Sequence, residues 1–92
     1  MKEPVVYILR SIKNNRYYIG STDNIEQRLT QHNSGQVKAT KNNTPFEVMI
    51  TIPCPNLSEA KGAEYRLKKY KRRDILEKVI QDRTFPWDYR GA

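Results

Sequence analysis

The sequence is poor in cysteine and has no long apolar run. Cys54 stands alone, which excludes an internal disulfide and a zinc site built from several cysteines. No stretch approaches the roughly 18 consecutive apolar residues of a membrane-spanning helix. The charged start at residues 1–4 is followed by no apolar segment of the kind that makes a secretory signal. These absences predict a cytoplasmic domain that does not enter a membrane.

Acidic residues are scarce relative to basic ones. The 92 residues include 17 lysines and arginines against 10 aspartates and glutamates, a formal net charge of +7. A field of that sign attracts polyanions, nucleic acid before anionic membrane, although a basic surface can also serve solubility alone. The length predicts a single domain over residues 1–92 with a modest core. Its body is expected at about 4–82, followed by an aromatic tail at 84–92.

Short β-rich segments and helical patterns divide the chain. Strands are predicted near residues 5–10, 17–21 and 46–52, and helices near 24–33, 58–70 and 74–82. Turn residues between the first two strands predict an antiparallel hairpin that places Tyr7 and Tyr18 on one face. Capping boxes predict helix starts at Asp23 and Asp74, and Ser58 is the predicted cap of the helix between them. Tyr18 beside Gly20 would either fill the core or hold a phosphate or a water.

Two of the predicted helices carry polar residues on or beside their apolar stripes. Arg28 and His32 share the stripe of Ile25 and Leu29, at about 100° per residue. Glu64 lies about 80° from the centre of the next helix's stripe, at the rim of the core. Such groups at a core edge mark a candidate site. The alternatives are that Arg28 extends past the core to solvent and that His32 caps a carbonyl.

Together these helices and the hairpin supply a candidate catalytic set: Tyr7, Tyr18, Arg28, His32 and Glu64. Phosphodiester hydrolysis needs such groups, because a base must activate water and a cation must balance charge on the phosphate. Glu64 could hold a divalent metal, Mg²⁺ or Mn²⁺, through oxygen. Arg28 could form a bidentate contact with a phosphate, and a tyrosine or the histidine could relay the proton.

Basic residues gather in a loop and in a late helix, and such runs either are solvated or bind phosphate. The predicted nucleic-acid contacts are Lys38, Lys41, Lys68, Lys69, Lys71, Arg72 and Arg73. The tail aromatics Phe85, Trp87 and Tyr89 could stack on bases, but packing onto the body is favoured.

The spacing of two tripeptides adds a resemblance. Val6-Tyr7-Ile8 and Tyr18-Ile19-Gly20 resemble the paired signatures that name the GIY-YIG nuclease family, and Arg28, His32 and Glu64 continue the pattern in order. The similarity covers about residues 4–80 and is greatest to small single-domain bacterial members, relatives of the UvrC N-terminal nuclease subdomain.

The resemblance implies an α+β fold, a three-stranded antiparallel sheet flanked by helices. It implies one divalent metal on Glu64, Arg28 on the scissile phosphate, and Tyr7 or Tyr18 beside the attacking water. Val6 stands in the place of the first signature glycine, and Ala39 stands where relatives often have an aromatic residue.

The implied function is metal-dependent endonucleolytic hydrolysis of DNA, in repair or recombination. A module without an attached DNA-binding unit should bind weakly and read little sequence. It could be recruited by a protein partner or act on branched or flapped DNA. The alternative is a non-catalytic, basic nucleic-acid-binding module on the same fold, but the intact candidate set favours the nuclease. The oligomeric state stays open.

Overall fold

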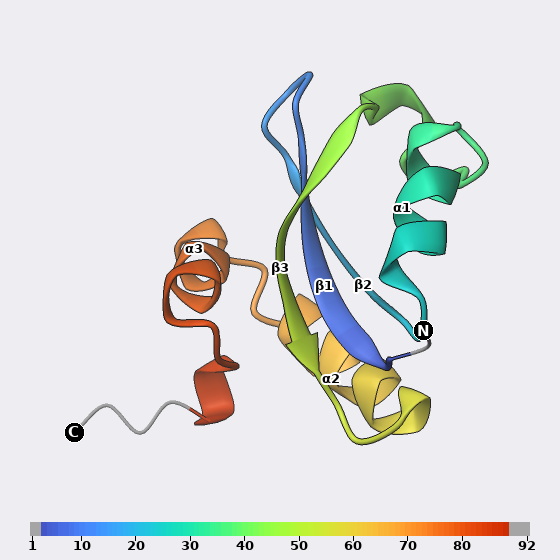
Figure 1. Ribbon diagram of the computed structural model, residues 1–92. Coiled ribbons are helices and arrows are strands. Elements are labelled where there is room, and N and C mark those ends of the chain that lie inside the picture. The colour runs from blue at the N-terminus through green and yellow to red at the C-terminus, as the bar shows by residue number, and fades with distance from the viewer. Residues whose placement is uncertain (1–2, 89–92) are drawn as a thin grey trace.

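The computed structural model describes residues 3–88 and has the predicted α+β architecture, a three-stranded antiparallel sheet with helices on both faces (Figure 1). Its elements are β1 (Val5–Ser11), β2 (Tyr17–Thr22), α1 (Ile25–Asn33), the short 3₁₀ turn η1 (Lys41–Asn43), β3 (Phe46–Pro53), α2 (Leu57–Lys68), α3 (Arg73–Asp82) and η2 (Pro86–Asp88). Over residues 3–88, no helix is long and apolar enough to cross a membrane.

The first strand lies in the middle of the sheet, whose order is β2-β1-β3. All five residues from Val5 to Leu9 are buried, because the strand is paired on both edges and covered on both faces. The hairpin places Tyr7 opposite Gly20 and Leu9 opposite Tyr18. Directly opposed residues share a face, so the predicted placement of Tyr7 and Tyr18 on one side is confirmed. This order leaves β2 at an edge of the sheet.

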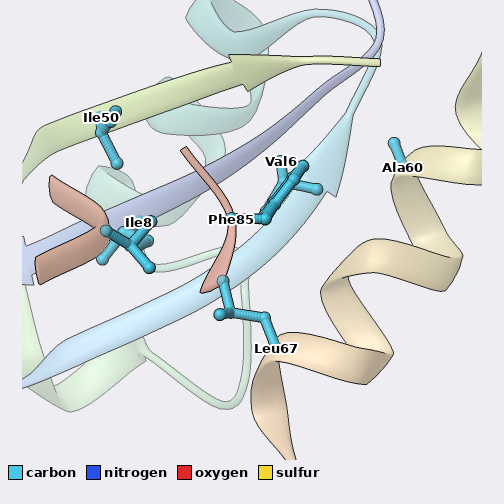
Figure 2. Packing of buried hydrophobic residues seen from close by; sticks show 7 residues of the cluster. Val6, Ile8, Ile50, Ala60, Leu67 and Phe85 are labelled. Carbon is cyan, nitrogen blue, oxygen red and sulfur yellow. The ribbon is translucent and has the colours of Figure 1, made fainter. Parts of the chain in front are cut away.

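Each face of the sheet has its own apolar cluster. On the side of α1, the buried residues Tyr7, Leu9 and Phe46 pack against Ile25 and Leu29. The larger cluster lies on the side of α2 and α3, which Figure 1 shows across the sheet from α1. It is formed by Val6, Ile8, Ile50, Ala60, Leu67, Val79 and Phe85, which come from β1, β3, α2, α3 and the tail. Figure 2 shows this packing, with all of these residues labelled except Val79.

The start of the aromatic tail packs onto the body. Phe85 is 6% exposed and belongs to the larger cluster. Trp87 stacks on Phe85 with ring centroids 4.7 Å apart, and the Arg66 guanidinium lies 4.3 Å from the centre of a Trp87 ring. Packing therefore accounts for these two aromatics. Tyr89 lies outside the described residues.

The predicted helix starts are wrong by one or two residues. Asn24 caps α1 by accepting from the Gln27 amide at 3.1 Å, and Asn56 caps α2 by accepting from the Glu59 amide at 2.8 Å. An asparagine oxygen just before the helix satisfies a first-turn amide as well as the predicted Asp or Ser would. The third helix starts at Arg73 with no side-chain cap, and Asp74 lies in its first turn.

Candidate active site

A tyrosine hydroxyl reaches the rim of the sheet because a glycine lies opposite it. Tyr7 is only 2% exposed, at the centre of the sheet. A Cβ atom added to Gly20 would lie 2.2 Å from the Tyr7 hydroxyl oxygen and 2.3 Å from its Cζ. The ring therefore occupies the space that any other side chain at position 20 would fill. Since β2 is an edge strand, the Tyr7 ring that lies over Gly20 extends from the central strand and places its hydroxyl at the edge of the sheet.

The first helix supplies the partners of this hydroxyl. His32 Nε2 lies 3.0 Å from the Tyr7 oxygen, and Arg28 Nε donates to that oxygen at 3.4 Å. The other ring nitrogen, His32 Nδ1, lies 2.8 Å from the Thr40 hydroxyl. Residues four apart on a helix share a face, which is why both side chains reach Tyr7. His32 is buried between two hydroxyl groups and does not cap a carbonyl through its ring.

Burial determines the protonation states of Tyr7 and His32. It raises the pKa of Tyr7 above its usual value of 10.0, against the opposing effect of Arg28. Burial, with the nearby Arg28 charge, lowers the pKa of His32 below 6.5. At neutral pH Tyr7 is thus protonated and His32 is neutral. A neutral imidazole has one acceptor nitrogen, so His32 Nε2 can receive the Tyr7 proton when Nδ1 carries the ring hydrogen.

A carboxylate reaches the same rim from the opposite face of the sheet. Ser21 follows Gly20 on β2, and its hydroxyl donates to Glu64 Oε1 at 2.5 Å. Lys68, one turn later on α2, donates to Glu64 Oε2 at 2.5 Å. The side chain of Glu64 is 22% exposed, against 53% for Lys68. Glu64 is therefore held at the rim by one strand and one helix.

A cavity of about 610 Å³ joins the two sides across β2, and it is lined by Tyr7, Tyr18, Arg28, His32 and Glu64 together with Gly20 and Ser21. Glu64 is the one acidic residue among its lining residues. The structure thus brings all five candidate residues to one concave surface. The two tyrosines differ, however, because the Tyr18 hydroxyl accepts from Asn43 Nδ2 at 2.7 Å and not from the α1 residues.

Comparison with known proteins extends the likeness beyond these residues. The family model described as the GIY-YIG catalytic domain matches residues 3–82. The chain belongs to the GIY-YIG family. It is therefore a nuclease-type domain, from a family of nucleases that act on DNA and generally use divalent metals.

Relatives align over most of this GIY-YIG domain. A UPF0213 protein of Oceanobacillus iheyensis is 40% identical over 75 residues, 80% of this chain and 86% of its own. One from Staphylococcus haemolyticus is 36% identical over 84 residues, 90% of this chain and 100% of its own. The UPF0213 protein YhbQ of Escherichia coli is 32% identical over 81 residues, 87% of this chain and 80% of its own. No solved structure matches the chain.

The predicted basic contacts of the GIY-YIG domain fall into three groups. Four line the cavity: Lys68, Lys71, Arg72 and Arg73. Lys69 directly follows α2 and places its amine over the Tyr65 ring. Lys38 and Lys41 are exposed in the segment after α1, outside the cavity lining. Sequence reasoning missed the lining residues Arg16, Ser21 and Thr40, although the first two flank the second signature.

One cavity arginine also has a structural role. Arg73 Nη1 donates to the Asn15 carbonyl at 2.8 Å, and its guanidinium lies 4.1 Å from the Tyr17 ring centre. These contacts fasten the β1–β2 turn to the start of α3. Arg72 is paired with Asp74 on the surface, its Nη2 2.6 Å from a carboxylate oxygen. Lys71 is consequently the better candidate for a phosphate contact, and Lys68 becomes one where a metal takes over the Glu64 carboxylate with which it now pairs.

The residues present fit a metal held by one carboxylate. Within residues 3–88, no group of three or more histidine, cysteine, aspartate and glutamate residues could hold an ion. Mg²⁺ is often bound by only one or two carboxylates and completes its shell with water and substrate phosphate. Glu64 offers such a carboxylate inside the cavity. The amine paired with it, on Lys68, is exposed and has a flexible stem that can move aside.

Proposed function

We propose that this domain hydrolyses DNA phosphodiester bonds endonucleolytically, with a divalent metal held by Glu64. The observation that carries the proposal is the meeting of three unlike groups in one cavity. A hydroxyl from β1, a guanidinium from α1 and a carboxylate from α2 surround the edge of β2 at Gly20 and Ser21. A base, a cation and a metal ligand are the groups that this reaction needs.

Tyr7 is the proposed general base, acting through His32. Its raised pKa means that the phenol does not ionise by itself at neutral pH. It can accept a proton from water only as it releases its own, and the acceptor is His32 Nε2, 3.0 Å away and neutral at pH 7. The Thr40 hydroxyl donates to the Val37 carbonyl at 3.4 Å and can therefore accept from His32 Nδ1 at 2.8 Å, which supports the tautomer that leaves Nε2 free to accept. Tyr18, tied to Asn43, is assigned to the wall that holds the substrate.

Arg28 and Glu64 are the proposed charge-balancing groups. Arg28 carries a permanent positive charge beside the Tyr7 oxygen, which favours a phosphate in the cavity and the negative charge that grows on it during attack. Glu64 would hold the metal on the other side of Gly20. The chemistry that a divalent ion supplies in such a site is neutralisation of charge on the phosphate and the leaving oxygen.

Lys68 and Lys71 are the proposed contacts for the flanking phosphates. With no base-reading element attached to the cavity in the part of the chain described, contacts to the backbone position DNA without reading its sequence. Branched or flapped DNA is the proposed substrate class, in repair or recombination, and a protein partner could raise the local concentration of such DNA.

The experiment uses labelled single-stranded, duplex, flap and junction DNAs, incubated with Mg²⁺, with Mn²⁺ or with a chelator. Wild-type protein should cut at least one substrate only in the presence of metal. Glu64→Gln removes the charge but keeps the shape, and it should reduce both cleavage and metal binding by calorimetry, since an amide is a poor ligand for a hard cation. Glu59→Gln, on the same helix but outside the cavity, is the matched control.

Two outcomes would count against the proposal. Binding of these DNAs without cleavage under any metal condition would favour the non-catalytic module. A Glu64→Gln variant that cuts like the wild type would remove Glu64 from the mechanism. A stability measurement separates this outcome from misfolding. The glutamine side chain can still accept from Ser21 and loses only the ion pair with the exposed Lys68, so the free energy of unfolding should change by no more than about 1 kcal/mol.

A further inference from the structure

The outer side of α2 carries an exposed aromatic ring that the proposed mechanism does not use. Tyr65 is 66% exposed, one of two large hydrophobic side chains so exposed among residues 3–88. Single exposed aromatics are common, so exposure alone says little. Three lysines, however, lie one turn from this tyrosine on the helix surface: Lys61, Lys68 and Lys69.

The ring is held in place by one of these lysines. Lys69 Nζ lies 4.4 Å from the centre of the Tyr65 ring, over one face. A cation on one face steadies a ring and leaves the other face free to stack. With 66% of the residue exposed, most of Tyr65 is open to solvent, which leaves room for a base against the ring. The arrangement has the two parts of a single-strand binding surface, a stacking platform and positive charge along the backbone path.

This platform is adjacent to the cavity. Glu64 precedes Tyr65 in the chain, and successive helix residues are about 100° apart, which on a helix of this diameter separates their side chains by roughly 8–10 Å. Lys68 connects the two, since it pairs with Glu64 and lies one turn after Tyr65. A strand whose scissile phosphate lies by Glu64 would therefore bring a base one or two nucleotides away onto the ring.

We infer that Tyr65, with Lys61 and Lys69, binds an unpaired nucleotide next to the cleavage site, so that the substrate has a single-stranded arm. A base inside a duplex presents no free face to a side chain, whereas an unpaired base does. The positive charge of the lysines around Tyr65 suits a polyanion and argues against an apolar protein partner. The role assigned to the cavity rests on the proposed function, but the single-strand preference of this surface can be tested without cleavage.

The test measures affinity by fluorescence anisotropy in a chelator, with a labelled oligothymidylate of about 12 nucleotides, a duplex of about 20 base pairs, and a fork that joins the two. Tyr65→Ala should lower the ratio of single-strand to duplex affinity about 5- to 100-fold, the effect of one lost base stack. Tyr65→Phe keeps the ring and should retain the wild-type ratio. Lys69→Gln should weaken the binding of both the single strand and the duplex and should reduce the salt dependence of both affinities, because it removes a charge and keeps the tyrosine ring.

The outcomes separate this inference from the proposed function. Equal single-strand to duplex ratios for the wild type and Tyr65→Ala, at unchanged melting temperature, would overturn the inference even if the wild type cuts DNA with metal. The inference is supported if the ratio of single-strand to duplex affinity falls in Tyr65→Ala and stays at the wild-type value in Tyr65→Phe. This holds even if no DNA is cut, in which case only the nuclease proposal fails. A Tyr65→Leu variant that retains the ratio would also overturn it, since leucine keeps apolar area but no ring to stack.

Discussion

Replacing Gly20 with alanine tests how the hydroxyl of Tyr7 is positioned. The new Cβ would lie 2.2 Å from the hydroxyl oxygen, where ordinary contact starts at 3.4 Å, so the ring must move by about 1.2 Å. Overpacking of this kind costs about 1–3 kcal/mol, and the strained or lost bond to His32 about 1 kcal/mol more. We expect a loss of about 2–4 kcal/mol in the free energy of unfolding, or roughly 10–20 °C in melting temperature.

The same displacement should reduce catalysis in the folded fraction. A misplacement of about 1 Å can cost on the order of 100-fold in rate, so cleavage per folded molecule should fall by about that factor. The assay pairs a chemical-denaturation curve with single-turnover cleavage of the best DNA substrate at a temperature where both proteins are folded.

A matched control exists in the same chain. Gly62 lies within α2, and a Cβ added to it would meet nothing within 4 Å beyond its chain neighbours and the backbone of its own helix, so Gly62→Ala should raise the free energy of unfolding by up to about 1 kcal/mol. In a Tyr7→Ala background the penalty of Gly20→Ala should largely disappear, so the coupling energy should be close to that penalty, about 2–4 kcal/mol. The reasoning is refuted if Gly20→Ala is as stable and active as wild type, or if its penalty persists without the Tyr7 ring.

Three further predictions follow from the site. Tyr7→Phe should lower single-turnover cleavage about 100- to 10,000-fold, as expected for loss of a general base, whereas Tyr18→Phe should keep more activity; the reverse ranking would transfer the role to Tyr18. The pKa of His32 is below 6.5 in the folded protein, so the folded state binds fewer protons there than the unfolded state. Its stabilising contribution is present above pH 6.5 and is lost as pH falls from 6.5 toward the folded pKa, with a slope of up to about 1.4 kcal/mol per pH unit. The free energy of unfolding, obtained from melting curves between pH 7 and 5.5, should fall with that slope in the wild type and with a smaller slope in His32→Gln. DNA affinity should fall steeply between about 50 and 200 mM salt, and Lys71→Gln should reduce the slope of log affinity against log salt by about 0.7–0.9; a slope insensitive to that substitution would place Lys71 away from the phosphates.

Local sequence signals were sufficient for the elements and for part of the site. The turn at residues 13–15 and the β-rich segments on either side determine the hairpin, and the hairpin determines which tyrosines share a face. The period of α1 likewise places Arg28 and His32 on one stripe, and both reach Tyr7 in the structure. These are short-range relations, for which helix and strand periodicity is a reliable guide.

Long-range relations could not be predicted in the same way. That β2 is an edge strand depends on where β3 pairs, about 30 residues later, and no local pattern specifies this. The Ser21–Glu64 contact and the Arg73–Tyr17 contact likewise join residues far apart in the chain. The misplaced helix starts have a more local cause, because neighbouring Asp, Asn and Ser residues compete for the same capping position.

The central position of β1 has a consequence for how the protein moves. Amide hydrogens in a strand paired on both edges and buried on both faces exchange with solvent only when the whole domain opens, whereas edge strands and exposed helices exchange through smaller fluctuations. We therefore expect the strand that carries Tyr7 to be the slowest-exchanging part of the fold. Glu64 and Lys68 lie on α2, which is held to the sheet by side-chain packing and hydrogen bonds rather than by backbone pairing. We therefore expect any widening of the cavity to come from movement on the α2 side, while Tyr7 keeps its place in the sheet.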